Sequence, residues 1–528
     1  MLSAIINKMS GRLRASLPCR RLIAAGPLIW FACILCAVEV AAAETEKPIE
    51  IGSRLELFVD RLLVDRMDGV AFRMHTPCRM PLARSPLNDV TPGQSPYGTG
   101  KDGQPQFVRN AYATVIKDGD LYRAYYRDVD PAHTGLRALM TCYAESADGH
   151  EWVKPELGII EVGGSKANNV IVRKNDYSHN FSPFLDTNPA ALPEERFKAL
   201  AMGRTKPDNQ RGLTAFVSAD GIHWQVLAPR PVITLDPPEE AFDSQNVAFW
   251  SETEGLYVCY FRSWRTGHGK LRTISRITSP DFINWNEPVC MEPNLPGEHL
   301  YTSQTHPYFR APHIYIALPT RYTAGQVDGG PSSGGMVGSS DILFMATRPG
   351  STRYDRLFTE AFIRPGLDSE RWGNRANYAA LNVVPTGPAE MSIYHAVSGH
   401  RYTLRTDGFI SIHAGSAPGE MVTKPLVFQG DSLVLNYSTA AAGHCLVELQ
   451  TSNGQIIPGF GLDDCIPLIG DHLERAVVWE NPADLSELSG QPVRLRFVMQ
   501  EADLYSMRFH AAEDRRAVAS RSASSGSE

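Results

Sequence analysis

Three carboxylates stand where predicted strands begin, and they are the residues best suited to acid–base chemistry. Asp243 lies in the polar string Asp-Ser-Gln-Asn directly before the apolar run NVAFW, and Asp341 opens the run DILFMATR. Glu370 stands in the polar segment SERWGNRAN. Two opposed carboxylates can serve as a general acid and as a base or nucleophile. We expect Asp243 to act with Asp341, with Glu370 as the alternative acid; the alternative is that these acids only cap backbone amides at strand ends.

The elements that must position these acids form an internal repeat. The motif Ser-x-Asp-Gly-x-x-Trp occupies 146–152 and 218–224, a variant occupies 279–285, and weaker copies occupy 347–350 and 405–408. The Asp-Gly pair favours a tight turn, and the Trp can pack between sheets. Each copy follows a strand-like run, and each period also holds an earlier pair of such runs. The pattern predicts an all-β protein whose residues 101–413 form a five-bladed β-propeller of four-stranded sheets.

The segments on either side of this propeller have other expected roles. Residues 44–100 contain strand-like runs and are expected to contribute to the propeller. Residues 414–511 alternate short apolar runs with turns and lack the repeat motif, which predicts an accessory β-sandwich domain. The polar tail 512–528 is expected to be disordered.

Residues 1–43 have the pattern of a secretory signal peptide. Basic residues without any acid precede the apolar run LIAAGPLIWFACILCAV, and three alanines end the segment. We expect cleavage after Ala43 and a secreted or periplasmic protein, with an uncleaved anchor as the alternative. No second long apolar run follows, so no membrane contact is expected after cleavage.

Charge and cysteine content exclude two further classes of function. The chain has 51 basic and 58 acidic residues and a net charge of −7, whereas nucleic-acid binders neutralise phosphates with Lys and Arg. Six cysteines lie beyond the signal segment, without CxxC or His at metal-ligand spacing, so no zinc site is expected. Cys445 and Cys465 are the one pair in which a disulfide is worth testing, and buried free thiols are the alternative.

The predicted layout resembles the exported five-bladed glycoside hydrolases related to families 32 and 43. The blade motifs carry this resemblance, together with FDSQNVAFWSETEGLYVCYFR at 242–262 and QPVRLRFVMQEADLYSMRF at 491–509. The resemblance implies a carbohydrate substrate and hydrolysis of glycosidic bonds by carboxylates around the central funnel, with no cofactor required. A structural Ca²⁺ in the channel is compatible with it, although no ligand string identifies one.

The sequence also departs from the best-known members of these families. It lacks a fructosidase nucleophile motif, an Arg-Asp-Pro string and a Glu-Cys pair. The first blade opens with Arg109-Asn110-Ala111, where an acid would be expected. Fructan cleavage is therefore not supported, and the family's catalytic residues cannot be transferred to this chain.

Polar and aromatic residues at the same face of the predicted propeller suit a sugar. Inner strands begin on this face and second-to-third strand loops return to it, so residues at both places should converge. The substrate-binding candidates chosen in this way are Arg109, Asn110, His179, Asn180, Gln245, Asn246, Trp264, Arg265, His306, Arg321, Trp372 and Arg375. Guanidinium groups pair well with carboxylate or sulfate, which favours a uronic or sulfated glycan. Pairing of these arginines with the chain's own acids is the alternative, and the two histidines can equally be core residues.

Two other functions remain open at this point. A non-catalytic glycan-binding propeller would explain the missing acid in the first blade. A sialidase-like hydrolase is suggested by the Asp-box-like motif, although five repeats do not make six blades, and such an enzyme would use a Tyr nucleophile and three arginines.

Overall fold

The structure is a computed structural model that describes residues 47–81, 112–130, 132–133, 135–173, 177–205, 209–235, 241–264, 270–291, 293–326, 337–480 and 484–510. This part of the chain is all-β, as predicted, and its helical elements are five short 3₁₀ turns. These are η1 (Gly135–Ala138), η2 (Tyr177–His179), η3 (Pro193–Glu195), η4 (Ser369–Arg371) and η5 (Leu485–Leu488). The signal segment and the polar tail lie outside the described residues.

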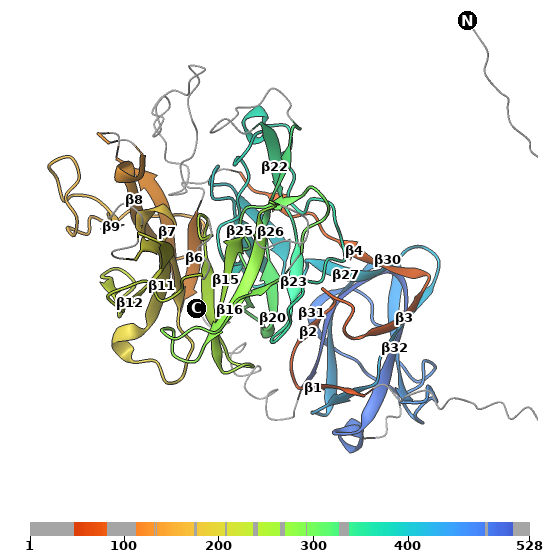
Figure 1. Cartoon of the computed structure of the whole chain (residues 1–528). Coiled ribbons are helices and arrows are strands. Elements are labelled where there is room, and N and C mark those ends of the chain that lie inside the picture. Colours follow the sequence, from red (N-terminus) through yellow and green to blue (C-terminus); the bar gives the residue numbers. More distant parts are fainter. Residues whose placement is uncertain are drawn as a thin grey trace, which may run out of the picture. The chain divides into compact units, whose positions relative to one another are not determined.

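Four small antiparallel sheets have four strands each (Figure 1). The first contains β6 (Ala113–Asp118), β7 (Leu121–Val129), β8 (Leu139–Ser146) and β9 (Val170–Val172). The second contains β10 (Ser182–Leu185), β11 (Phe197–Arg204), β12 (Arg211–Ser218) and β13 (Gln225–Val226). The third contains β14 (Val247–Ser251), β15 (Leu256–Ser263), β16 (Thr273–Ser279) and β17 (Val289–Cys290). The fifth contains β24 (Val384–Pro385), β25 (Glu390–Tyr394), β26 (Arg401–Arg405) and β5 (Cys78–Arg79).

The fourth repeat is divided into two three-stranded sheets. One contains β18 (His299–Leu300), β21 (Thr320–Ala324) and β22 (Gly338–Ile342), and the other β19 (His306–Tyr308), β20 (Ala311–Ala317) and β23 (Met345–Thr347). Only two residues separate β20 from β21, and two separate β22 from β23. The division therefore falls within two continuous segments, one that contains β20 and β21 and one that contains β22 and β23. The first is interrupted at Pro319, which has no amide hydrogen to donate to a neighbouring strand.

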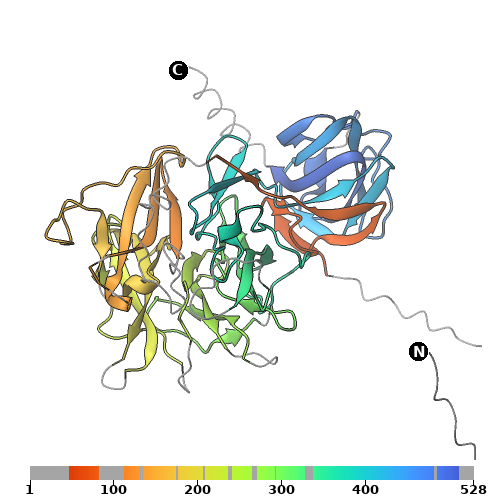
Figure 2. The same cartoon turned by 90° about the horizontal axis from the view of Figure 1, so that it is seen from above.

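The innermost strands of most neighbouring sheets contact one another, and His306 of β19 accepts a hydrogen bond from the amide of Val383, the residue before β24. Strand β10 contacts both β6 and β14, β14 contacts β19, and β24 contacts β6. The last contact includes a parallel bridge between Thr114 and Leu381. The chain thus returns to its first sheet after the fifth, and Figure 2 shows the sheets following one another from orange to teal.

The repeat motif makes the turns expected of it. Oδ1 of Asp148 accepts hydrogen bonds from the amides of His150 and Glu151, and Oδ1 of Asp220 does the same in the second sheet. The motif tryptophans pack between neighbouring sheets. Trp224 lies 6.3 Å from Tyr125 of the first sheet, edge to face, and Trp152 lies 5.8 Å from Tyr394 of the fifth.

The C-terminal part forms a ten-stranded sheet that takes up most of the N-terminal segment. Its strands are β1 (Ile49–Gly52), β2 (Glu56–Leu57), β3 (Val64–Asp68), β4 (Val70–Met74), β27 (Ile410–Ala414), β28 (Gly419–Thr423), β29 (Leu426–Phe428), β30 (Ser432–Thr451), β31 (Asp471–Ala476) and β32 (Pro492–His510). The sheet encloses one apolar core, in which residues from both halves of β30 and β32 pack together. Figure 2 shows the red strands among the blue ones.

The described strands of residues 44–100, the segment expected to contribute to the propeller, divide between two sheets. Strands β1 to β4 pair with C-terminal strands, and only β5 joins the fifth small sheet. Strand β27 follows the fifth motif but pairs with β4 and β32 instead of continuing its own sheet. The edge that β27 leaves open on β26 is covered by β5, which satisfies backbone groups that would otherwise be exposed.

The described residues contain six free cysteines and no disulfide. Cys445 and Cys465 are both buried, and Sγ of Cys465 accepts a hydrogen bond from the amide of Val447 over 3.3 Å. In the parts of the chain that the structure describes, we find no helix with the length and apolar character needed to cross a membrane.

Candidate functional site

Asp243 lies beside a histidine and an arginine from two neighbouring sheets. Nε2 of His179 is 2.8 Å from Oδ1 of Asp243, and Nη2 of Arg262 is 3.4 Å from Oδ2. The side chain of Asp243 remains 44% exposed, whereas those of His179 and Arg262 are 16% and 5% exposed. The carboxylate is therefore held from behind while one side of it stays open to an incoming molecule.

The charge state of this group follows from its neighbours. Burial alone would raise the pKa of Asp243. The hydrogen bond from His179 and the charge of Arg262 lower this pKa by more than burial raises it, so it lies well below the ordinary value. Burial lowers the pKa of His179, more than the bond to Asp243 raises it. Because Nη1 of Arg127 approaches Nδ1 at 3.5 Å, the neutral ring donates from Nε2 to Asp243.

Arginines and aromatic residues from all five repeats lie around this pair, and we call the group the axial cluster. Its members are Tyr112, Arg127, His179, Asp243, Arg262, Trp264, Arg272, Tyr301, Arg375 and Tyr378. The guanidinium of Arg127 lies 4.8 Å from the ring of Tyr112, and that of Arg272 lies 4.5 Å from Tyr301 and 4.7 Å from Trp264. The ring of Tyr378 lies 5.8 Å from Tyr112 and 6.2 Å from Tyr301.

The cluster concentrates positive charge. Arg375 faces Tyr112, Tyr301 and Tyr378 from a left-handed backbone conformation with φ of 64°. Burial lowers the pKa of Arg272, and Arg262 and Arg375 lower it further. Tyr378 is fully buried, and burial raises its pKa well above the ordinary value, so its hydroxyl stays protonated. The arrangement can hold an anionic group of a ligand beside an ionised Asp243.

Asp341, the expected partner of Asp243, is engaged elsewhere. It faces Arg321 across β21 and β22, and the two make a two-pronged ion pair with distances of 2.9 and 2.5 Å. Arg321 also donates to the carbonyl of Thr359 and lies 3.9 Å from Glu298. Arg321 thus binds Asp341, one of the chain's own acids, which is the alternative to binding an anionic sugar. Glu370 belongs to η4, the turn that precedes Arg375 by four residues.

Gln245 was expected to bind substrate, but it lies buried where the sheets meet. Its Nε2 donates to the carbonyl of Ala113 and to Oγ1 of Thr114, over 3.1 and 3.0 Å. Its Oε1 accepts from Gln304, whose Nε2 also donates to the carbonyl of Ala379. Gln245 and Gln304 together therefore link the first, third, fourth and fifth repeats through hydrogen bonds.

Three other expected ligand-binding residues have their side chains occupied in the same way. Asn180 donates to the carbonyl of Phe242 and accepts from the amide of Met202. Asn246 donates to the carbonyls of Phe242 and Ser244. Buried His306 lies 2.8 Å from the carbonyl of Gln304 through Nδ1 and accepts from the amide of Val383 at Nε2.

The remaining candidates divide between the cluster and other places. His179, Trp264 and Arg375 belong to the axial cluster, and Trp372 donates from Nε1 to the carbonyl of Gly366. Arg109, Asn110 and Arg265 lie outside the described residues. Within the described residues no three His, Cys, Asp or Glu side chains come together as a metal site.

The sequence interpretation missed several members of the cluster, although a repeat signal marks two of them. An arginine ends or nearly ends the second strand of three successive units, as Arg127, Arg204 and Arg262. Two of these, Arg127 and Arg262, belong to the axial cluster. Tyr112, Arg272 and Tyr301 stand in the segments just before or after short strands, and no repeat marks them.

Comparison with known proteins gives structural neighbours only. No protein-family model matches the chain, and no curated protein matches it. A thermostable family-43 glycoside hydrolase is 11% identical with a TM-score of 0.37, over 60% of this chain and 94% of that one. A fructofuranosidase from Schwanniomyces occidentalis complexed with fructosylnystose is 12% identical with a TM-score of 0.33, over 81% and 98%. The β-1,2-mannobiose phosphorylase from Listeria innocua is 10% identical with a TM-score of 0.41, over 62% and 96%.

Several of the neighbours are glycoside hydrolases, the class that the sequence resembles. Identities and TM-scores this low transfer neither an activity nor the role of any residue to this chain.

Proposed function

We propose that the protein is an exported glycosidase that acts on an anionic glycan at the axial cluster. In this proposal the small sheets are five blades of one propeller, with the two three-stranded sheets of the fourth repeat counted as a single blade. The contacts that join the inner strands β6, β10, β14 and β19 in sequence, with β24 returning to β6, support five blades. Export rests on the signal-like residues 1–43 and predicts that the mature protein begins at Glu44.

The observation that carries the proposal is an ionised carboxylate beside several arginines. Arg127, Arg262, Arg272 and Arg375 can bind the carboxylate or sulfate of a sugar, and two of them, Arg262 and Arg272, lie over the ring of Trp264. Asp243 stays ionised, so it suits the part of base or nucleophile and not that of general acid. Since Asp341 is paired with Arg321, Glu370 becomes the first candidate for the acid.

The mechanism follows from these roles. The arginines bind the anionic substituent and fix the sugar, while the proton needed by the leaving oxygen comes from the second carboxyl group. Asp243 then attacks the anomeric carbon or activates a water molecule, according to whether the two carboxyl groups lie about 5–5.5 Å or about 6.5–9.5 Å apart. His179 orients Asp243 from behind and is a positioning residue.

A panel of glycans tests the proposal. The mature protein is incubated with uronic, sulfated, sialylated and neutral oligosaccharides, and the released reducing sugar is measured. We expect release from an anionic glycan, loss of turnover with retained binding in Asp243→Asn, and weaker binding in Arg375→Met. A preference for neutral glycans would overturn the anionic substrate, and unchanged turnover in Asp243→Asn would overturn the catalytic role of Asp243.

A non-catalytic glycan-binding protein is the second candidate. It is favoured by the engagement of Asp341 with Arg321, which takes away the expected partner of Asp243. A binding protein would retain anionic oligosaccharides on an affinity column without releasing any sugar. In that case Asp243→Asn has no turnover to lose, and Glu370→Gln behaves like the wild type in every assay.

A further inference from the structure

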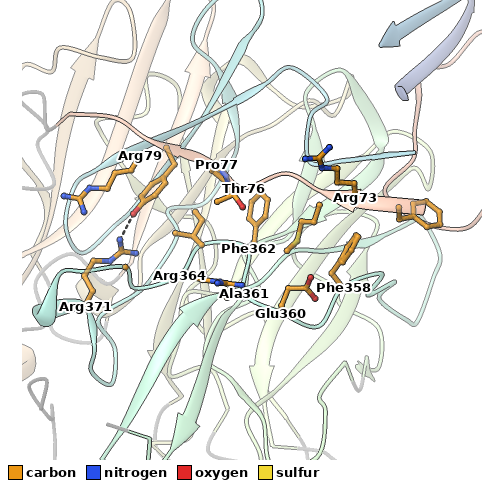
Figure 3. Close-up of a pocket in the computed structure, with 15 residues that line it drawn as sticks. Arg73, Thr76, Pro77, Arg79, Phe358, Glu360, Ala361, Phe362, Arg364 and Arg371 are labelled. Atoms are coloured by element: carbon orange, nitrogen blue, oxygen red, sulfur yellow. Dashed lines mark hydrogen bonds between the residues drawn. The ribbon is translucent and has the colours of Figure 1, made fainter. Parts of the chain in front are cut away.

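A cavity whose lining shares no residue with the axial cluster lies between the C-terminal sheet and the fourth and fifth repeats. Its volume is about 600 Å³, and its lining comes from β4, the segment around β5, residues 358–366 and the fifth sheet. Four arginines line it, namely Arg73, Arg79, Arg364 and Arg371, and we call it the arginine cavity. In Figure 3, Arg79 and Arg371 lie toward one end, Arg73 toward the other, and Arg364 between them.

Arg371 is the feature that points to a ligand. It is 5% exposed, its Nε donates to Oδ1 of Asn377 over 2.9 Å, and its Nη1 donates to the hydroxyl of Tyr402. Among the residues that the structure describes, its Nη2 is buried and has no hydrogen-bond partner. A buried charged donor that lacks an acceptor is costly, so a ligand oxygen entering beside it would be favoured.

The lining of the arginine cavity carries an excess of positive charge. Among the described lining residues, four arginines stand against one carboxylate, that of Glu360; outside the lining, Asp503 lies 3.8 Å from Arg73. Burial lowers the pKa of Arg371, Tyr402 and Asp368 raise it, and the charge of Arg79 lowers it further, as expected for two like charges placed near each other. An anion between them would relieve this repulsion.

The apolar part of the lining suits more than a bare ion. Phe72, Phe358 and Phe362 line the cavity together with Tyr402. The faces of sugar rings pack on such aromatic surfaces, and a cavity of this volume is in the range of sites for small organic molecules.

We propose that the arginine cavity is a second glycan-binding site, which takes a sugar carrying a sulfate or carboxylate group. The anionic group lies between Arg79 and Arg371, and the ring lies toward Phe358 and Phe362. The role proposed for this site is to bind a glycan, because its described lining is made of arginines and aromatic residues. A chain with both sites would contact one anionic glycan at two places and remain attached to it between cleavages.

Equilibrium dialysis of the mature protein against galactose 6-sulfate and glucuronate tests this proposal. We expect two bound molecules per chain in the wild type and one in Arg375→Met, which removes the axial site. Arg79→Met, an exposed position where folding is not at risk, should weaken the remaining site about tenfold or more, and Arg371→Met should do the same. The control is Arg66→Met, since Arg66 is exposed on β3 and pairs only with Glu420 among the described residues.

The outcomes separate the two sites. Binding that is unchanged in both Arg79→Met and Arg371→Met overturns the arginine cavity as a site. Binding of inorganic sulfate or of galactose as tight as that of galactose 6-sulfate overturns the assignment to an anionic sugar. One bound molecule in the wild type that Arg79→Met removes and Arg375→Met leaves would support the cavity while contradicting the proposed axial function.

Discussion

Gln304 donates a hydrogen bond from Nε2 to Oε1 of Gln245 over 2.8 Å, and both side chains are buried where the inner strands meet. Gln304 stands before β19 with φ of 51°, a left-handed conformation that is uncommon outside glycine. Since Gln245 also donates to the first repeat, this pair links segments of chain far apart in sequence. The link gives these buried side chains hydrogen-bond partners within the protein.

We predict that Gln245→Ala destabilises the protein by about 2–3 kcal/mol. The substitution leaves Oγ1 of Thr114 and the carbonyl of Ala113 without the donor that they share, and it opens a small void. Urea denaturation followed by tryptophan fluorescence measures the loss. The control is Gln225→Ala, because Gln225 is exposed on the edge strand β13 and should cost less than about 0.5 kcal/mol. Equal losses in the two variants would contradict the role of Gln245 in joining the repeats.

Asp407 gives a second prediction, at the junction with the C-terminal sheet. It is fully buried, accepts from the hydroxyl of Tyr308 over 2.7 Å and pairs with Arg310 over 2.6 Å. It also accepts from Asn436 and Ser506 of the C-terminal sheet. We expect Asp407→Ala to cost about 3–5 kcal/mol, because it leaves the charge of Arg310 without this partner.

The matched control for Asp407 is the same residue type in another copy of the repeat. Asp148 caps an exposed turn, and Asp148→Ala should cost about 1 kcal/mol. Thermal unfolding of both variants is the measurement. A loss in Asp407→Ala no larger than that in Asp148→Ala would show that the buried junction adds nothing.

These two residues also show how far the sequence allowed the fold to be predicted. The repeat, its tight turns and the packing of Trp152 and Trp224 between sheets follow from local spacing and are confirmed. The fifth copy was interpreted as one more turn, yet Asp407 bonds to β30 and β32 across 29 to 99 residues of chain. Pairing of β1 to β4 with C-terminal strands is equally non-local, and one sequence contains no signal for which distant edge a strand will join.

His306 provides a prediction about pH and stability. Burial lowers its pKa from 6.5 to about 4, although the contact with the carbonyl of Gln304 raises it. Between pH 6.5 and 4 the unfolded chain binds a proton that the folded chain does not, so stability falls as the pH falls. The difference corresponds to about 3 kcal/mol over this range.

The measurement for His306 is the free energy of unfolding in urea at several values of pH. His306→Gln removes the titrating group, so its stability should decline less than that of the wild type between pH 6.5 and 4, by about 3 kcal/mol. Other buried histidines, such as His395, contribute equally to both proteins. Parallel curves for the two proteins would contradict the lowered pKa of His306.

The site was predictable only in part, for a physical reason. Asp243 stands at a strand start, and strand starts gather at one face, so its place followed from topology. The same rule selected Asn180, Gln245 and Asn246, which stand in the segments that precede β10 and β14. Their side-chain amides donate to backbone carbonyls of the protein itself. Sequence shows which residues reach the axis but not which of them the backbone will use there.

The contact between His179 and Asp243 yields the last prediction. Replacing His179 with leucine removes a hydrogen bond that lowers the pKa of Asp243, so that pKa should rise toward its ordinary value near 4. A ¹³C NMR titration of the labelled aspartate carboxyl measures it directly. If the protein hydrolyses an anionic glycan, the acid limb of its kcat/KM profile should move to higher pH in parallel. His223→Leu is the control, since exposed His223 pairs with Asp220 in a turn of the second sheet, and it should leave both readouts unchanged. An Asp243 pKa that stays well below the ordinary range without His179 would mean that Arg262 and Arg211 hold the carboxylate ionised by themselves.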